Sequence, residues 1–164
     1  CYFSNLEVNT GFPPDWLTDP ITGTHFKNNL HWSRISDYGS SDIKFLWEAN
    51  RFSYIFQLIR AYAIQPDERY AQAFWLTISS WMEANPPGYG PNWKDGQEVA
   101  LRLMAACFGY YAFLFSSSTK VEDITRFTLF AAAHAERRRH RRRPPARSRS
   151  AAGARRARSA RRSE

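Results

Sequence analysis

The chain has 164 residues, about the length of one domain, and hydrophobic residues make up 43% of it. This composition excludes a wholly disordered chain, because such chains lack the apolar residues that build a core. The net charge of +8 is unevenly distributed: residues 1–135 carry ten Lys and Arg against thirteen Asp and Glu, whereas residues 136–164 carry thirteen Arg against two Glu. The body is therefore mildly acidic, and the C-terminal segment is strongly basic.

Cysteine and histidine indicate neither a metal site nor a disulfide framework. The two cysteines, Cys1 and Cys107, are too few for a set of bridges, and neither a CxxC pair nor a HExxH motif occurs. We therefore expect no metal and no cofactor. The chain also lacks a run of about 18 to 20 apolar residues, so we expect no membrane span.

Residues 1–43 predict an irregular lead-in that packs on a helical body, because turn signals such as Pro13-Pro14 and Asp19-Pro20 punctuate them. Residues 44–135 predict the helical domain, since apolar residues there recur at steps of three and four. We expect helices over 42–64, with Ser41 or Asp42 as N-cap, over 67–84, over 97–115, and from Val121 onward. Four helices with short connections and no strand indicate an all-α body of antiparallel hairpins.

Residues 136–164 form an Arg-rich tail that contains no large apolar residue, so we expect it to be disordered. Arginine binds phosphate backbones, but this tail has no lysine and no aromatic side chain for base stacking. GC-rich DNA that is read out of frame also yields Arg, Ala, Pro, Ser and Gly. We favour a frame error over a nucleic-acid-binding tail.

The first candidate site lies within residues 42–51. Lys44, Glu48 and Arg51 share one helix face, and Trp47 and Asn50 flank it. The pattern is typical of a solvated face on which Glu48 pairs with both cations and adds little stability. It also suits an anionic sugar, because an indole stacks on a pyranose ring and a guanidinium binds a carboxylate or sulfate through two N–H groups. Both interpretations stay open.

The second candidate site combines Asn92 and Trp93, in the loop over 89–96, with Glu98 and Arg102 on the following helix. A helix N-terminus beside a Gly- and Pro-rich loop presents free backbone N–H groups to an anion. Ordinary capping and one surface pair between Glu98 and Arg102 would produce the same pattern. No catalytic triad and no GxSxG elbow occurs, so we name no catalytic residue.

Several segments in succession resemble the N-terminal helical domain of the heparinase II/III family of polysaccharide lyases. They are DIK and WEANR within 42–51, AY at 61–62, DERYA at 67–71, WMEANPPG at 81–88, NW at 92–93 and GQEVALR at 96–102. The resemblance covers about residues 12–137 and depends on the order of the segments. It implies a partial (α/α) toroid of hairpins whose groove binds an acidic, uronate-containing polysaccharide of the heparin or heparan sulfate kind. It also implies a periplasmic or secreted bacterial enzyme.

The resemblance further implies which residues shape the groove. They are Trp47, Glu48, Asn50, Arg51, Asn92, Trp93, Glu98 and Arg102. An alternative role for some of them is to lock hairpin to hairpin through buried hydrogen bonds.

The family's reaction is β-elimination, in which neutralising the uronate carboxylate makes the C5 proton acidic. In the family the first catalytic Asn and His follow the helix that begins here near Val121, where this chain has its Arg-rich tail. We therefore expect a truncated, inactive fragment with an exposed inner face and poor solubility. Two other classes stay open: a helical-repeat scaffold that binds a protein, although no repeat of about 34 residues is visible, and a nucleic-acid binder that uses the tail.

Overall fold

The structure is a computed structural model that describes residues 10–36 and 42–140. Within these ranges it contains helices and no strand, which confirms the predicted all-α class. The α-helices are α1 (Lys44–Ala49), α2 (Ile55–Ile64), α3 (Glu68–Ala84), α4 (Gly96–Phe113) and α5 (Val121–His140). Two short 3-10 helices are η1 (Trp32–Arg34) and η2 (Pro91–Trp93). None of the helices in this part of the chain is both long and apolar enough to cross a membrane.

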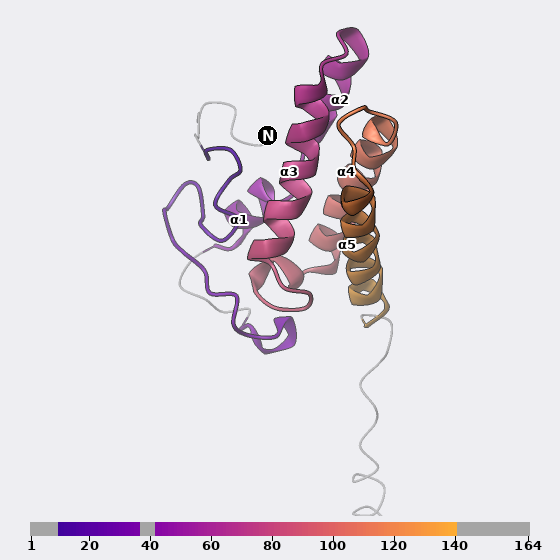
Figure 1. Cartoon of the computed structure of the whole chain (residues 1–164). Helices are drawn as coiled ribbons and strands as arrows, with labels where there is room; N and C mark the ends of the chain where they lie inside the picture. The colour runs from indigo at the N-terminus through magenta and orange to yellow at the C-terminus, as the bar shows by residue number, and fades with distance from the viewer. Residues whose placement is uncertain (1–9, 37–41, 141–164) are drawn as a thin grey trace, which may run out of the picture.

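The four long helices form two hairpins that pack side by side (Figure 1). α2 packs against α3 within the first hairpin, and α4 packs against α5 within the second. Between the hairpins, α2 contacts α4 and α3 contacts α5. We call the end with α1, η2 and the start of α4 the network end, and the end with the connections over 65–67 and 114–120 the turn end. Closure of a toroid stays a prediction.

Two helix starts agree with the sequence because an aspartate caps each of them. Asp67 accepts a hydrogen bond from the Arg69 N–H at 2.9 Å, and α3 follows from Glu68. Asp95 accepts from the N–H groups of Gln97 and Glu98 at 2.6 and 3.2 Å, and α4 begins at Gly96. Side-chain acceptors of this kind satisfy the backbone donors that the first helical turn leaves unpaired.

The prediction of one continuous helix over 42–64 is wrong, because α1 and α2 are separate. Phe52, between them, has a positive φ of 59°, a conformation that a helix does not accommodate. Its ring is nevertheless fully buried, so the apolar pattern continues across the break and conceals it. The prediction of Asp42 as N-cap is wrong, because Ile43 is the N-cap of α1; Asp42, one residue earlier, accepts from the Lys44 N–H at 3.1 Å, and Ser41 lies outside the described residues.

The core lies between the hairpins and is rich in aromatic rings. Phe52, Trp81 and Phe130 contact one another with ring centroids 5.6 to 6.3 Å apart. Gly109 lets α4 approach the first hairpin closely, because a Cβ at this position would lie 2.3 Å from the Phe74 ring. Any larger residue at position 109 would push the two hairpins apart.

The lead-in is attached to the network end of the helices. The Trp16 ring is buried, packs edge-on against Phe52 and donates from Nε1 to the Ser80 hydroxyl at 3.1 Å. Further along, the Asn28 side chain donates to the Ala84 carbonyl at 2.8 Å, at the end of α3.

The expected boundary between Ala135 and Glu136 falls inside α5, which continues to His140. Arg137 is buried there and donates from Nε to the Trp93 carbonyl at 2.7 Å. The last turn of α5 therefore packs on the fold, although its composition already resembles that of the tail. The prediction of disorder over residues 136–164 is therefore wrong for residues 136–140, and the rest of the tail, 141–164, lies outside the described residues, as do residues 1–9.

Candidate functional site

The structure brings all eight predicted groove residues together at the network end. Four of them, Asn50, Asn92, Trp93 and Arg102, are almost completely buried, and Glu98 is 5% exposed. The remaining three are partly exposed, namely Trp47, Glu48 and Arg51. The set therefore divides into a buried group and a group at the surface.

The surface group is organised around Arg51. The Arg51 guanidinium donates to both carboxylate oxygens of Glu98 at 2.7 Å each, and a further N–H contacts Glu48. This bonding to Glu98 is the main reason why the pKa of Arg51 is raised above its usual value. One cation thus serves two carboxylates, so Arg51 presents no unpaired charge to a ligand.

Two predicted ion pairs are replaced by others. Lys44 Nζ lies 3.6 Å from Asp42 rather than pairing with Glu48, because both Lys44 and Asp42 are exposed at the start of α1. Glu98 does not form a surface pair with Arg102, because Arg102 points into the core and Arg51 takes both oxygens of Glu98. Helical spacing alone does not reveal which of two neighbouring arginines is buried.

The buried group begins with Asn50 and Arg102. Asn50 donates to the carbonyls of Leu46 and Trp16 at 2.8 and 3.2 Å, and its Oδ1 accepts from Trp81 Nε1 at 2.8 Å. Arg102 donates from Nε to the Asn50 carbonyl at 2.8 Å and stacks 4.4 Å above the Trp81 ring. Because this arrangement removes the guanidinium from water, the pKa of Arg102 is lowered to about 9.

Asn92 connects the loop before α4 to the same group. Its side-chain N–H groups donate to the Trp16 carbonyl and to Asn85 Oδ1 at 2.9 Å each, and its carbonyl accepts from Arg102 at 3.2 and 3.3 Å. Trp93 donates to the Asn85 carbonyl at 3.3 Å. These bonds fix the backbone of the loop, since each one joins groups from different elements.

Sequence reasoning missed His134 and Arg137 as members of this group. His134 is fully buried, contacts the rings of Trp93 and Phe130, and lies 3.5 Å from the Arg102 guanidinium. Burial, and to a lesser extent the charge of Arg102, lower the pKa of His134 to about 3. Arg137 stacks 3.5 Å above the Trp32 ring of the lead-in. The sequence signal was HAER at 134–137, which places both side chains on one face of a helix.

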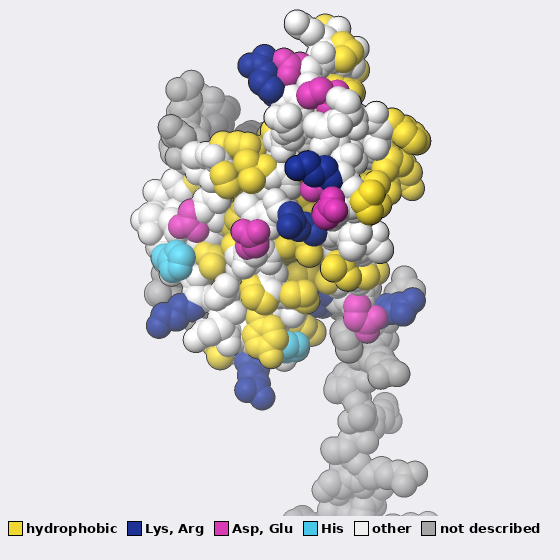
Figure 2. All heavy atoms as spheres, viewed as in Figure 1, with side chains coloured by type: hydrophobic (Ala, Val, Ile, Leu, Met, Phe, Trp, Pro, Cys, Tyr) yellow, Lys and Arg dark blue, Asp and Glu magenta, His cyan; other side chains and the backbone are white. Residues whose placement is uncertain are grey.

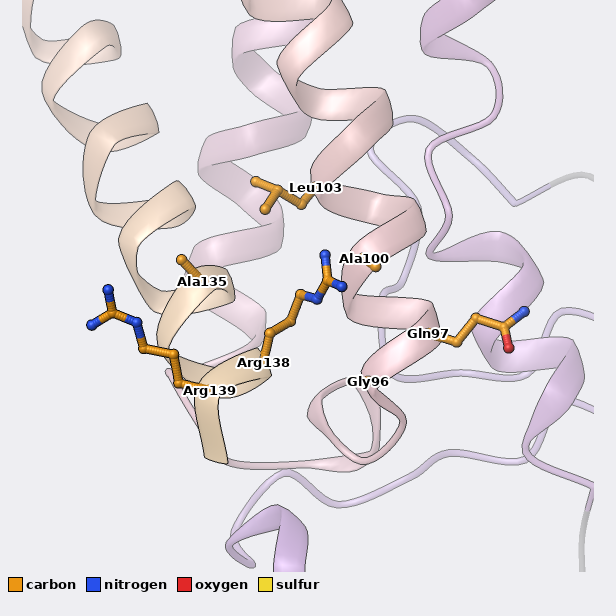
Figure 3. Close-up of a pocket in the computed structure, with 7 residues that line it drawn as sticks. All are labelled: Gly96, Gln97, Ala100, Leu103, Ala135, Arg138 and Arg139. Atoms are coloured by element: carbon orange, nitrogen blue, oxygen red, sulfur yellow. The ribbon is translucent and has the colours of Figure 1, made fainter. Parts of the chain in front are cut away.

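A pocket with a volume of about 840 Å³ lies between the start of α4 and the end of α5 (Figure 3). Small residues leave this space open, and Arg138 extends from α5 toward α4. Arg139 points away on the other side of α5, and Gln97 points away from the pocket centre. The residues that line this pocket are Gly96, Gln97, Ala100, Leu103, Ala135, Arg138 and Arg139.

The family model described as Heparinase II/III N-terminus matches residues 6–141, which is most of the chain. The chain belongs to this heparinase II/III family. The match includes the lead-in and α5 through His140. No curated protein and no solved structure matches the chain.

Within this heparinase II/III domain, most of the polar residues at the network end bind backbone carbonyls. A buried polar side chain whose hydrogen bonds go to the protein contributes to the position of neighbouring elements rather than to direct contact with a ligand. The partly exposed groups, Trp47, Glu48 and Arg51, lie above this buried layer and are the ones that can reach solvent.

Proposed function

We propose that this chain forms part of the groove wall of a polysaccharide lyase that cleaves uronate-containing acidic polysaccharides by β-elimination. The family match over residues 6–141 carries the proposal, because it covers the lead-in and all five helices. A periplasmic or secreted location follows from the same family and is part of the proposal.

The geometry supports a division of roles among the eight residues. Trp47, Glu48 and Arg51 border the groove, and Glu98 orients Arg51 from below through two hydrogen bonds. A guanidinium that is already held in this way binds an incoming carboxylate or sulfate only by exchanging one of its partners, Glu48 being the more exposed. The other four residues position the backbone of α1, η2 and α4: Asn50, Asn92, Trp93 and Arg102.

Arg138 adds a cation in the pocket between α4 and α5; among residues 10–36 and 42–140 it forms no ion pair, whereas Arg139 lies 3.8 Å from Glu136. Among its seven lining residues, the two charged ones are both arginines, and neither acid of the Arg51 cluster lines it. The pocket is therefore more suitable for an anionic group than the Arg51 cluster, in which one cation faces two carboxylates. We assign no described residue to proton transfer and expect no lyase activity from this chain alone.

Binding to immobilised heparin tests the proposal, provided that the Arg-rich tail is present in every protein compared. In the full chain, Arg138→Gln and Arg51→Gln should each weaken binding about three- to tenfold, whereas Arg60→Gln, at an exposed position of α2, should change it less than about twofold. Equal affinities of all four proteins would mean that the tail alone binds heparin. Absorbance of an unsaturated uronate product should not appear.

A further inference from the structure

The lead-in contains a carboxylate, on Asp19, that is buried and only half satisfied. Asp19 is 0% exposed, and its Oδ1 accepts from the N–H groups of Ile21 and Thr22 at 2.8 and 3.1 Å. Its second oxygen, Oδ2, is also buried and has no hydrogen-bond partner. Leaving a buried acceptor unpaired is costly, so Oδ2 indicates a missing donor or cation.

Asp19 lines a pocket of about 220 Å³ between the lead-in and the end of α1. The neighbouring groups are rich in oxygen, because Asp15, Thr18 and Thr10 line the same pocket. Asp15 accepts from the Thr18 hydroxyl at 2.7 Å and from the Leu17 N–H at 3.0 Å, so its carboxylate is held in place.

The charge around this pocket is negative. Two carboxylates line it, and neither a lysine nor an arginine does. The basic group that contacts either of them is His25, whose Nδ1 lies 3.8 Å from Asp15 Oδ2. An exposed imidazole at that distance does not compensate the buried oxygen of Asp19.

We propose that this pocket binds a hard, oxygen-liganded divalent cation of the Ca²⁺ type, with Asp19 Oδ2 as its first protein ligand. Among residues 10–36 and 42–140, no three His, Cys, Asp or Glu side chains meet as a metal site, so hydroxyl oxygens, backbone carbonyls and water complete the ligand set. Ca²⁺ accepts such mixed oxygen ligands in flexible geometry, whereas Zn²⁺ prefers nitrogen and sulfur. With only two carboxylates, the affinity should be weak, with a Kd of roughly 0.1 to 1 mM.

A bound cation would stabilise the contact between the lead-in and the end of α1. The pocket lies between the lead-in loop and Ala49 at the end of α1. The Asp19 carbonyl closes this loop by accepting from the Gly23 N–H at 2.9 Å. A ligand that binds only the folded chain raises its melting temperature in proportion to the logarithm of its concentration. This inference is independent of the proposed polysaccharide groove, because it concerns a different part of the chain.

The test is the thermal unfolding of the full chain after removal of divalent ions with a chelator, at pH 7.5. We expect 10 mM CaCl2 to raise the Tm by about 3 to 5 °C relative to NaCl of equal ionic strength, and MgCl2 to raise it less. Asp19→Asn should abolish the shift, whereas Asp42→Asn, at an exposed carboxylate, should retain it. A Tm that is the same in CaCl2 and NaCl, or a shift that survives in Asp19→Asn, would overturn the proposal.

A second measurement covers the case in which Asp19→Asn does not fold. Tb³⁺ luminescence, sensitised by Trp16 in the same loop, should appear with the unaltered chain and be displaced by Ca²⁺. Asp15→Asn, at an exposed side chain, should keep the fold and raise the apparent Kd for Ca²⁺ about tenfold. An unchanged Kd in Asp15→Asn would show that the carboxylates of this pocket do not bind the ion.

Discussion

The two ends of the helical hairpins both consist of helix ends and connecting loops, but they differ in the side chains that cover them. At the network end, buried polar side chains, Arg137 of α5 among them, bond to carbonyls of the lead-in, of the end of α1 and of η2, so hydrogen bonds join the ends of several elements. At the turn end, large apolar side chains face solvent, among them Tyr111 and Phe115, which are 75% and 93% exposed. Figure 2 shows hydrophobic side chains gathered near the connection between α4 and α5.

The two ends differ mainly in exposed apolar surface, because hydrogen bonds also join α3 to the connection over 114–120, from the Ser118 N–H to Glu68 at 3.0 Å and from Trp75 to Thr119 at 2.8 Å. Hydrogen bonds between elements hold the backbone at the network end in place, whereas an exposed apolar surface lowers solubility. The exposed stripe continues along α4 through Met104 and Phe108, and the Phe108 ring meets Phe56 of α2. If the stability of the fold depends on the network end, substitutions there should cost more free energy of unfolding than substitutions at the turn end.

The largest effect is expected from Arg102→Ala. The change removes the donors of the Asn50 and Asn92 carbonyls and leaves a cavity beside Trp81, and we expect it to lower the free energy of unfolding by about 3 to 5 kcal/mol. Urea unfolding measures it, with Arg60→Ala as a control that should cost less than about 0.5 kcal/mol. Similar midpoints for both variants would remove the distinction between buried and exposed arginines.

Arg51→Gln should have the next largest effect, because it leaves the buried Glu98 carboxylate without its bidentate partner. We expect a loss of about 2 to 3 kcal/mol in the same unfolding experiment. The double variant Arg51→Gln, Glu98→Gln should recover part of this loss, since no uncompensated charge then remains. Additive losses would show that the two side chains do not interact in solution.

The pH dependence of stability should show the burial of His134. Its pKa is lowered from 6.5 to about 3 in the folded chain, so between these values the unfolded chain binds one more proton. The contribution of His134 to the free energy of unfolding is therefore fully present above pH 6.5. It falls as the pH decreases, by about 2 kcal/mol from pH 7 to pH 5.

His134→Gln should remove this contribution, because glutamine does not titrate. Urea unfolding of the unaltered chain and of His134→Gln at pH 7 and pH 5 makes the comparison. Equal slopes in the unaltered chain and in His134→Gln would contradict a neutral, buried His134.

The smallest effect on stability is expected at the turn end. Phe115→Ser should change the free energy of unfolding by less than about 0.5 kcal/mol, because the side chain is 93% exposed. The same change should increase solubility and reduce self-association, which light scattering measures. A large loss of stability would mean that Phe115 packs in solution against a surface of the same chain.

Much of the fold was predictable, because helix caps and helical periodicity depend on residues that are close together in the sequence. Asp67 and Asp95 cap α3 and α4, and the helical period fixed the class and the four long helices. The break at Phe52 was not predictable. The buried Phe52 ring fits the apolar spacing of a helix, although the backbone at this residue has a positive φ that ends the helix. The end of α5 was also missed, because Arg137 looks like a tail residue until its carbonyl partners are known.

The candidate site could be located from the sequence, but the roles of its residues could not. Asn50 follows the last residue of α1 and Arg102 lies between two leucines in α4, and at such positions a polar side chain can either reach solvent or bind carbonyls of another element. The distinction depends on contacts with Trp16 and Asn92, which lie 34 and 10 residues away along the chain. Helical periodicity contains no information about such partners.

Hydrogen–deuterium exchange of the full chain tests the central claim most directly, because it compares the two ends in one experiment. We predict that amides of α3 and α4 near Trp81, Asn85 and Arg102 exchange at the slow rate of global unfolding, whereas amides flanking the connections over 65–67 and 114–120 exchange much faster. Equal exchange rates at the two ends, or faster exchange around Arg102, would contradict the claim that the buried network holds this domain together.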